Sequence, residues 1–87
     1  MNIEITFGKV LRQLRKRARL TQEQLGFEAG LERNYISMLE LGQRHPSLAT
    51  IFKLSPPLKT KPSNIVALLE TAISSEDANS STGANND

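Results

Sequence analysis

The side chains of this 87-residue chain that could do chemistry are suited to binding rather than to bond breaking. The chain has one histidine, His45, and no cysteine, and its two aspartates, Asp77 and Asp87, lie near the C-terminal end. These residues cannot supply the nucleophile and base, or the cluster of metal ligands, that an active site needs. We therefore expect no enzyme activity, cofactor, metal or small-molecule substrate, and we expect His45 to be an ordinary loop residue.

The charge distribution favours a polyanionic partner. The formal net charge is only +2, but residues 1–69 carry eleven Lys or Arg against five Glu, a net of +6. Residues 70–87 carry only acidic groups, a net of −4. A basic body suits nucleic acid, although many domains with a charged surface share this property.

Apolar spacing predicts a compact all-α domain of five helices. The helices are expected at residues 7–20, 21–30, 32–41, 48–54 and 62–73. Thr21 and Gln24 have the spacing of a capping box, and Gly30 can end the second helix in the left-handed conformation. Ser47 is expected to cap the fourth helix. Pro56 and Pro57 must end that helix.

The domain is expected to span residues 1–73, with Leu58 folded back onto its core. From Ser74 the sequence has no large apolar residue. Burial therefore cannot offset the entropy of ordering, which predicts a disordered tail over residues 74–87. The start has no basic stretch followed by an apolar run, and no apolar run approaches the roughly 20 residues that span a bilayer. We expect a cytoplasmic protein, associated with a bacterial or phage nucleoid.

The stretch TQEQLGFEAGLERNYISMLELG, residues 21–42, has the spacing of a helix-turn-helix. Two short helices flank a tight glycine turn, and small Gly26 is expected where another helix approaches closely. Apolar residues stand where a perpendicular helix pair needs contacts, namely Leu25, Ala29, Leu31, Ile36 and Leu39. In such a motif the second helix enters the major groove of DNA and its N-terminal residues meet the base edges.

The sequence resembles the lambda-repressor/Cro-like (Xre-type) family over roughly residues 7–69. The segments that carry the resemblance are LRQLRKRARLTQEQL, AGLERNYISMLELG and HPSLATIFKL. The resemblance implies a compact five-helix domain, usually dimeric, that controls transcription by binding double-stranded DNA.

Three sets of site residues are implied by the resemblance. The outward face of the third helix would read bases through Arg33, Asn34, Ser37 and Met38. The DNA backbone would be held by Gln22, Tyr35, Gln43 and Arg44. Arg15 and Glu40 match a pair that forms a buried salt bridge between the first and third helices.

The chemistry of these residues fits their roles, and each has a structural alternative. Arg33 can pair with guanine, Asn34 with adenine or a phosphate, and Met38 can touch a thymine methyl group. Arg33 and Asn34 could equally line a solvated helix face, and Met38 could lie at the edge of the core. Four further cations of the first helix are expected to serve solubility rather than DNA contact: Arg12, Lys16, Arg17 and Arg19. Most of that helix faces away from DNA in this fold.

The fifth helix predicts a homodimer. It is apolar nearly all round, more than a small core can cover from one side. Its expected dimer residues are Ile65, Leu68, Leu69, Ala72 and Ile73. Pairing there would set two recognition helices about 34 Å apart, one turn of B-DNA, on a palindromic or pseudopalindromic operator. Two alternatives stay open: a fully buried terminal helix, and an antitoxin whose main partner is a toxin.

Overall fold

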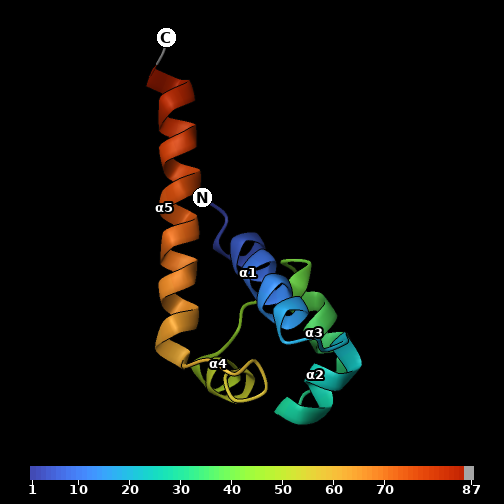
Figure 1. The fold of residues 1–87 in the computed structure, drawn as a ribbon. Helices are drawn as coiled ribbons and strands as arrows, with labels where there is room; N and C mark the ends of the chain where they lie inside the picture. The colour runs from blue at the N-terminus through green and yellow to red at the C-terminus, as the bar shows by residue number, and fades with distance from the viewer. Residues whose placement is uncertain (86–87) are drawn as a thin grey trace.

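The computed structural model describes the backbone of residues 1–85 and the side chains of residues 1–76. Within that part the chain forms five helices and no strand, which confirms the predicted fold class. The helices are α1 (Ile3–Arg17), α2 (Gln22–Ala29), α3 (Arg33–Glu40), α4 (Leu48–Leu54) and α5 (Pro62–Asn85). Figure 1 shows α5 running along one side of the other helices and continuing beyond them.

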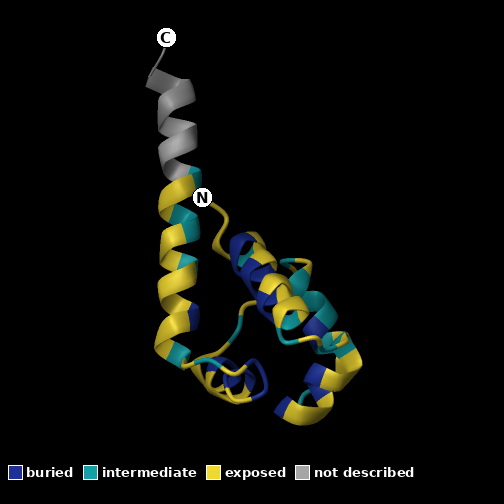
Figure 2. Ribbon diagram, viewed as in Figure 1, coloured by how far each residue is buried: buried dark blue, intermediate teal, exposed yellow. Residues whose placement is uncertain are grey.

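The hydrophobic core is built around α1, which packs against α3 and α5, while α2 packs against α3. Three- and four-residue spacing brings Phe7, Leu11 and Leu14 to one side of α1, where all three are buried. The same cluster takes at least one residue from each other helix, including Leu25, Ala29, Ile36, Leu39, Ile51, Leu54 and Ile65. Figure 2 shows that the outer sides of the helices are largely exposed.

The first helix begins at Ile3, earlier than the predicted Phe7. Asn2 caps it, because its Oδ1 accepts a hydrogen bond from the Ile5 backbone N–H at 2.9 Å. The Thr6 hydroxyl oxygen also lies 3.0 Å from the Asn2 carbonyl oxygen. Asparagine is among the best N-cap residues, so the sequence carried a start signal that apolar spacing alone did not use.

The predicted signals at the ends of α2 and α4 are confirmed. Thr21 Oγ1 accepts from the Gln24 N–H at 3.0 Å, and Gln24 Oε1 accepts from the Thr21 N–H at 2.9 Å, which completes the capping box. Gly30 ends α2 in the left-handed conformation, with φ 70°. Ser47 Oγ accepts from the Thr50 N–H at 3.0 Å and so caps α4.

Gly26 is needed for a reason that differs from the predicted one. A Cβ atom at Gly26 would lie 2.6 Å from the Leu31 carbonyl oxygen, far inside ordinary contact distance. The close neighbour is therefore the backbone of the turn between α2 and α3, rather than a packed helix. Because the Leu31 N–H donates to the Gly26 carbonyl at 2.7 Å, the turn has little room to move away.

The connection between α4 and α5 follows the proline prediction. The last helical residue of α4 is Leu54, and Ser55 stands as its C-cap before Pro56 and Pro57. Leu58 returns to the core and is 5% exposed. The Thr60 N–H donates to the Ser55 carbonyl at 3.1 Å, which closes this turn before α5 begins.

The fifth helix is longer than predicted. The sequence analysis ended it near Ile73 and expected disorder from Ser74, whereas the structure continues the helix to Asn85. One reason is a polar anchor, because Glu76 Oε1 accepts from the Thr6 hydroxyl of α1 at 2.8 Å. Composition reflects only apolar burial, so it does not indicate a polar contact of this kind. For residues 86–87 the predicted disorder lies outside the described residues.

Candidate nucleic-acid interface

The recognition face of α3 arises from its buried side. Ile36 and Leu39 are fully buried in the core, so the residues between and opposite them turn outward. Arg33 and Asn34 are exposed at the first turn, while Ser37 and Met38 are half-buried. The four predicted base-reading residues thus share one helix whose inner side is fixed, with the arginine and the asparagine most open to solvent.

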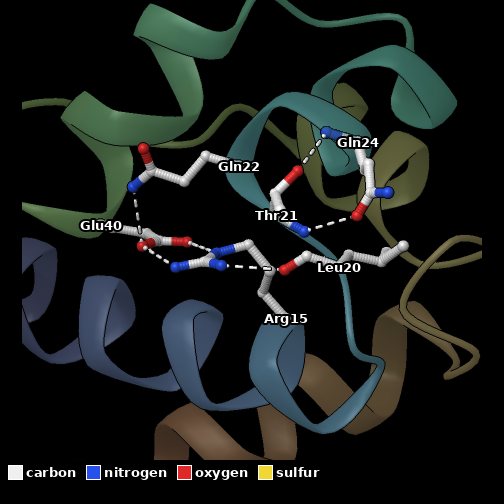
Figure 3. Close-up of polar contacts among 6 residues, drawn as sticks. All are labelled: Arg15, Leu20, Thr21, Gln22, Gln24 and Glu40. Carbon is white, nitrogen blue, oxygen red and sulfur yellow. Dashed lines mark hydrogen bonds and ion pairs between the residues drawn. The ribbon is translucent and has the colours of Figure 1, made fainter.

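The salt bridge between α1 and α3 fixes the position of this helix (Figure 3). Arg15 Nε donates to Glu40 Oε2 at 2.6 Å, and Arg15 Nη2 donates to Glu40 Oε1 at 3.1 Å. The two side chains are 12% and 5% exposed, so water screens the pair weakly. Arg15 Nη1 also donates to the Leu20 carbonyl at 2.9 Å, which ties the α1–α2 turn into the same network.

Gln22, predicted to contact a phosphate, belongs to this network as well. Its Nε2 donates to Glu40 Oε1 at 3.1 Å, and Figure 3 shows its carboxamide turned toward Glu40. A carboxamide nitrogen has two hydrogens, so the second can still serve a phosphate. A cavity of about 310 Å³ lies beside it, lined by Arg15, Thr21, Gln22, Glu23 and Arg33. It lies where the first turn of α2 meets the first residue of α3.

Tyr35 has a partner that the sequence did not predict. Its hydroxyl lies 3.2 Å from Thr50 Oγ1, and the latter lies 3.0 Å from Ser47 Oγ at the start of α4. Tyr35 is half-buried, and its ring packs against the core. A phosphate contact through this hydroxyl requires the phenol to donate to the phosphate and Thr50 to donate to the phenol.

The loop after α3 presents Gln43 and Arg44 to solvent, next to Gly42 with φ 76°. His45 Nε2 lies 2.5 Å from Glu4 Oε2, so this loop is attached to α1. The sequence analysis gave His45 no special role and did not find this pair, because Glu4 precedes the expected start of the first helix.

Gly8 is another functional position that the sequence analysis missed. A Cβ atom there would fall against the Glu40 carbonyl and would lie 2.6 Å from the Leu39 carbonyl oxygen. Only a glycine lets α1 approach the last turn of α3 this closely. An isolated glycine inside an amphipathic helix was the available signal.

The predicted dimer residues of α5 do not form one free surface. Ile65 is 1% exposed and belongs to the core of its own chain, so its assignment to the dimer interface is wrong. Leu69 and Ala72 are half-buried against the same core, and Ile73 is half-buried too. Leu68 alone of the five is exposed, at 41%. Helical spacing places Ile65 on the side of α5 that packs against the core.

Exposed apolar surface lies instead on α4 and the adjoining side of α5. Leu48 and Phe52 are 75% and 63% exposed, and Val66 is 46% exposed. They line a shallow cavity of about 440 Å³ together with Ile51, Pro62, Ser63, Ala67 and Glu70. A continuous apolar patch of this kind is typical of an interaction surface.

Among residues 1–76, no group of three or more potential metal ligands comes together. No helix in the described part of the chain has the length and apolar character to cross a bilayer.

The fold and this outward helix define a helix-turn-helix protein. The family model for helix-turn-helix proteins named HTH_3 matches residues 11–65, and the chain belongs to this family. It is a family of DNA-binding transcription regulators, not of enzymes, as the sequence predicted.

Three similar proteins illustrate the relationship. "Control protein C.BamHI" of Bacillus amyloliquefaciens is 41% identical over 66 residues, which cover 75% of this chain and 82% of that protein. "Immunity repressor protein" of Bacillus phage phi105 is 36% identical, over 85% of this chain and 51% of the repressor. The solved restriction-modification controller protein C.AhdI from Aeromonas hydrophila is 43% identical, with a TM-score of 0.68, over 70% of this chain and 92% of that one.

Proposed function

We propose that this chain acts as a homodimeric transcription regulator that places α3 in the major groove of a palindromic or pseudopalindromic operator. The observation that carries the proposal is the exposed first turn of α3, where Arg33 and Asn34 face solvent on a helix held by a buried salt bridge. A fixed helix that presents an arginine and an amide can match the donor and acceptor pattern of base edges.

The proposed division of labour separates base reading from backbone contact. Arg33, Asn34, Ser37 and Met38 select the sequence, while Gln22, Tyr35, Gln43 and Arg44 bind phosphates on either side of α3. The hydrogen bond that Gln22 donates to Glu40 supports the second group, because it orients the Gln22 side chain at the start of α2. Groups held in place before binding lose less conformational entropy when DNA arrives.

The proposed dimer contact uses the exposed apolar side of α4 and α5. Leu48, Phe52 and Val66 take the place of the buried Ile65 as its central residues, whereas Leu68 lines separate cavities beside α1. A second copy of the chain would cover these side chains. The two α3 helices would then lie about 34 Å apart, one at each half of the operator. Sedimentation at micromolar concentration is expected to show a dimer of the 9.6 kDa chain.

The similar controller proteins suggest a genomic setting. We propose that this chain acts in the bacterial cytoplasm as a regulator of a restriction-modification locus, because the similar solved protein C.AhdI is named as a restriction-modification controller. A binding site upstream of a neighbouring endonuclease or methyltransferase gene would support this assignment.

Selection of bound sequences from a random duplex pool tests the main proposal. The expected product is one two-fold symmetric site whose half-sites are separated by about one turn of DNA. Arg33→Ala is expected to relax the choice at one base position in each half-site. A selected pool without any consensus, or a consensus unchanged by Arg33→Ala, would contradict base reading by α3.

A further inference from the structure

The turn between α1 and α2 holds an arginine in a backbone conformation that normally favours glycine. Arg19 has φ 62°, in the left-handed region. Its N–H donates to the Lys16 carbonyl at 3.0 Å, and the next N–H, of Leu20, donates to the Arg15 carbonyl at 3.1 Å. These bonds close the end of α1, and they require the left-handed residue between them.

A residue with a Cβ atom is strained in this conformation, whereas glycine is not. The strain is not offset by a visible contact of the side chain. Arg19 is exposed, and the ion pairs among residues 1–76 join other residues. The last turn of α1 already has Arg15, Lys16 and Arg17 to interact with the negative end of the helix. The fold alone therefore gives no reason for an arginine here.

The position of Arg19 supplies a reason. It lies two residues before Thr21, the N-cap of α2, so the two Cα atoms are at most about 7 Å apart. The 310 Å³ cavity lined by Thr21, Gln22 and Arg33 begins at this helix end. A duplex that contacts the start of α2 and the start of α3 must pass close to the α1–α2 turn.

We propose that Arg19 binds a DNA phosphate and extends the DNA-binding surface from α2 and α3 onto the α1–α2 turn. The inference rests on the proposed function, because it requires α3 to lie in the groove. The guanidinium then offers up to five N–H donors to the phosphates of the DNA strand that lies next to α2. Strained backbone at residues other than glycine clusters at ligand-binding sites, so the conformation of Arg19 and its place beside the start of α2 together point to this role.

Lys59 offers a matched control inside the same chain. It also has a left-handed backbone, with φ 56°, and it is also an exposed cation at the end of a helical turn. The cavity beside it, about 330 Å³, is lined by residues of α1, the α4–α5 connection and α5, and by none of α2 or α3. Replacement of Lys59 by glycine thus relieves the same strain and removes the same charge, away from the proposed DNA surface.

The experiment compares Arg19→Gly, Arg19→Lys and Lys59→Gly in the full chain. Thermal unfolding is measured by circular dichroism, and affinity for the selected operator duplex is measured by fluorescence anisotropy from ~50 to ~200 mM salt. Both glycine variants are expected to melt roughly 2–4 °C higher than the parent chain. Only Arg19→Gly is expected to bind several-fold more weakly, with a salt slope lower by about 0.9 per protomer. Arg19→Lys is expected to keep the slope.

Three results would overturn the proposal. A lower melting temperature for Arg19→Gly would show that the side chain stabilises the fold. An unchanged salt slope would show that it contacts no phosphate. If Arg19→Gly and Lys59→Gly weakened binding of the duplex equally, the lower net charge alone would explain the loss. If the parent chain bound no duplex at all, the proposed function itself would fail, and the role of Arg19 with it.

Discussion

The network around Glu40 allows one stability prediction to be worked through in detail. Glu40→Gln keeps the shape of the side chain and one acceptor oxygen but removes the charge that faces Arg15. Arg15 keeps its bond to the Leu20 carbonyl, yet its guanidinium is then a charge at a site only 12% exposed. Removal of one partner from a buried pair costs about 3–5 kcal/mol, and the retained bonds place this variant near the lower limit, at about 3 kcal/mol.

That loss is large for a chain of this size. Typical values per residue give a total unfolding free energy of about 4–13 kcal/mol for 87 residues. Glu40→Gln is therefore expected to lower the melting temperature by roughly 10–20 °C. Urea denaturation followed by circular dichroism is the assay, and the midpoint is expected to fall without a change in the m-value.

Two further variants separate the ion pair from other effects. Glu32→Gln removes an exposed carboxylate that makes no side-chain cap to α3, so its effect is expected to stay within about 0.5 kcal/mol. Arg15→Met combined with Glu40→Leu removes both charges together and is expected to be less destabilised than Glu40→Gln. A loss below about 1 kcal/mol for Glu40→Gln would refute the idea that this pair fixes α3.

Four other predictions concern the binding surface and the packing around it. Arg33→Ala should cost about 1–3 kcal/mol on the selected operator and much less on unrelated DNA, as measured by anisotropy. Arg44→Ala should weaken all duplexes alike and reduce the salt slope by about one unit, and a loss confined to the operator would contradict its phosphate role. Gly26→Ala should lower the urea midpoint, although alanine favours helices, because the new Cβ meets the Leu31 carbonyl oxygen; an increase would contradict the clash. Phe52→Glu should give a folded monomer on sedimentation, whereas an intact dimer would exclude this face.

Local signals made most of the fold predictable. Thr21 and Gln24 at the start of α2, and Gly30 at its end, act through neighbouring backbone atoms, so spacing alone defines them. Pro56 and Pro57 work in the same way, since they prevent helix geometry whatever surrounds them. The outward positions of Arg33 and Asn34 followed from the helical period, because Ile36 and Leu39 had to turn inward.

Contacts between distant residues were less predictable. The hydrogen bond of Thr6 with Glu76 joins residues 70 apart, and no local pattern indicates that α5 continues far enough to make it. Ile65 was misassigned because an all-apolar helix does not reveal which side meets the core. The contact of Tyr35 with Thr50 depends on how α3 and α4 cross, which composition does not determine.

The recognition helix owes its position to its neighbours rather than to its own sequence. An isolated helix of eight residues is unstable in water, and α3 lacks even a side-chain N-cap at Glu32. Its stability must therefore come from its neighbours: Ile36 and Leu39 are buried in the core, α1 approaches closely at Gly8, and the Arg15–Glu40 pair joins its last turn to α1. The Gly8 approach and the Arg15–Glu40 pair both lie at the C-terminal end of α3, so they leave the side chains of Arg33 and Asn34 at its start exposed. The residues that hold α3 thus leave its N-terminal residues exposed. The hydrogen bond of Gln22 with Glu40 connects this network to the start of α2. If α3 binds DNA as proposed, the stability of the fold and the affinity for DNA depend on the same buried carboxylate of Glu40.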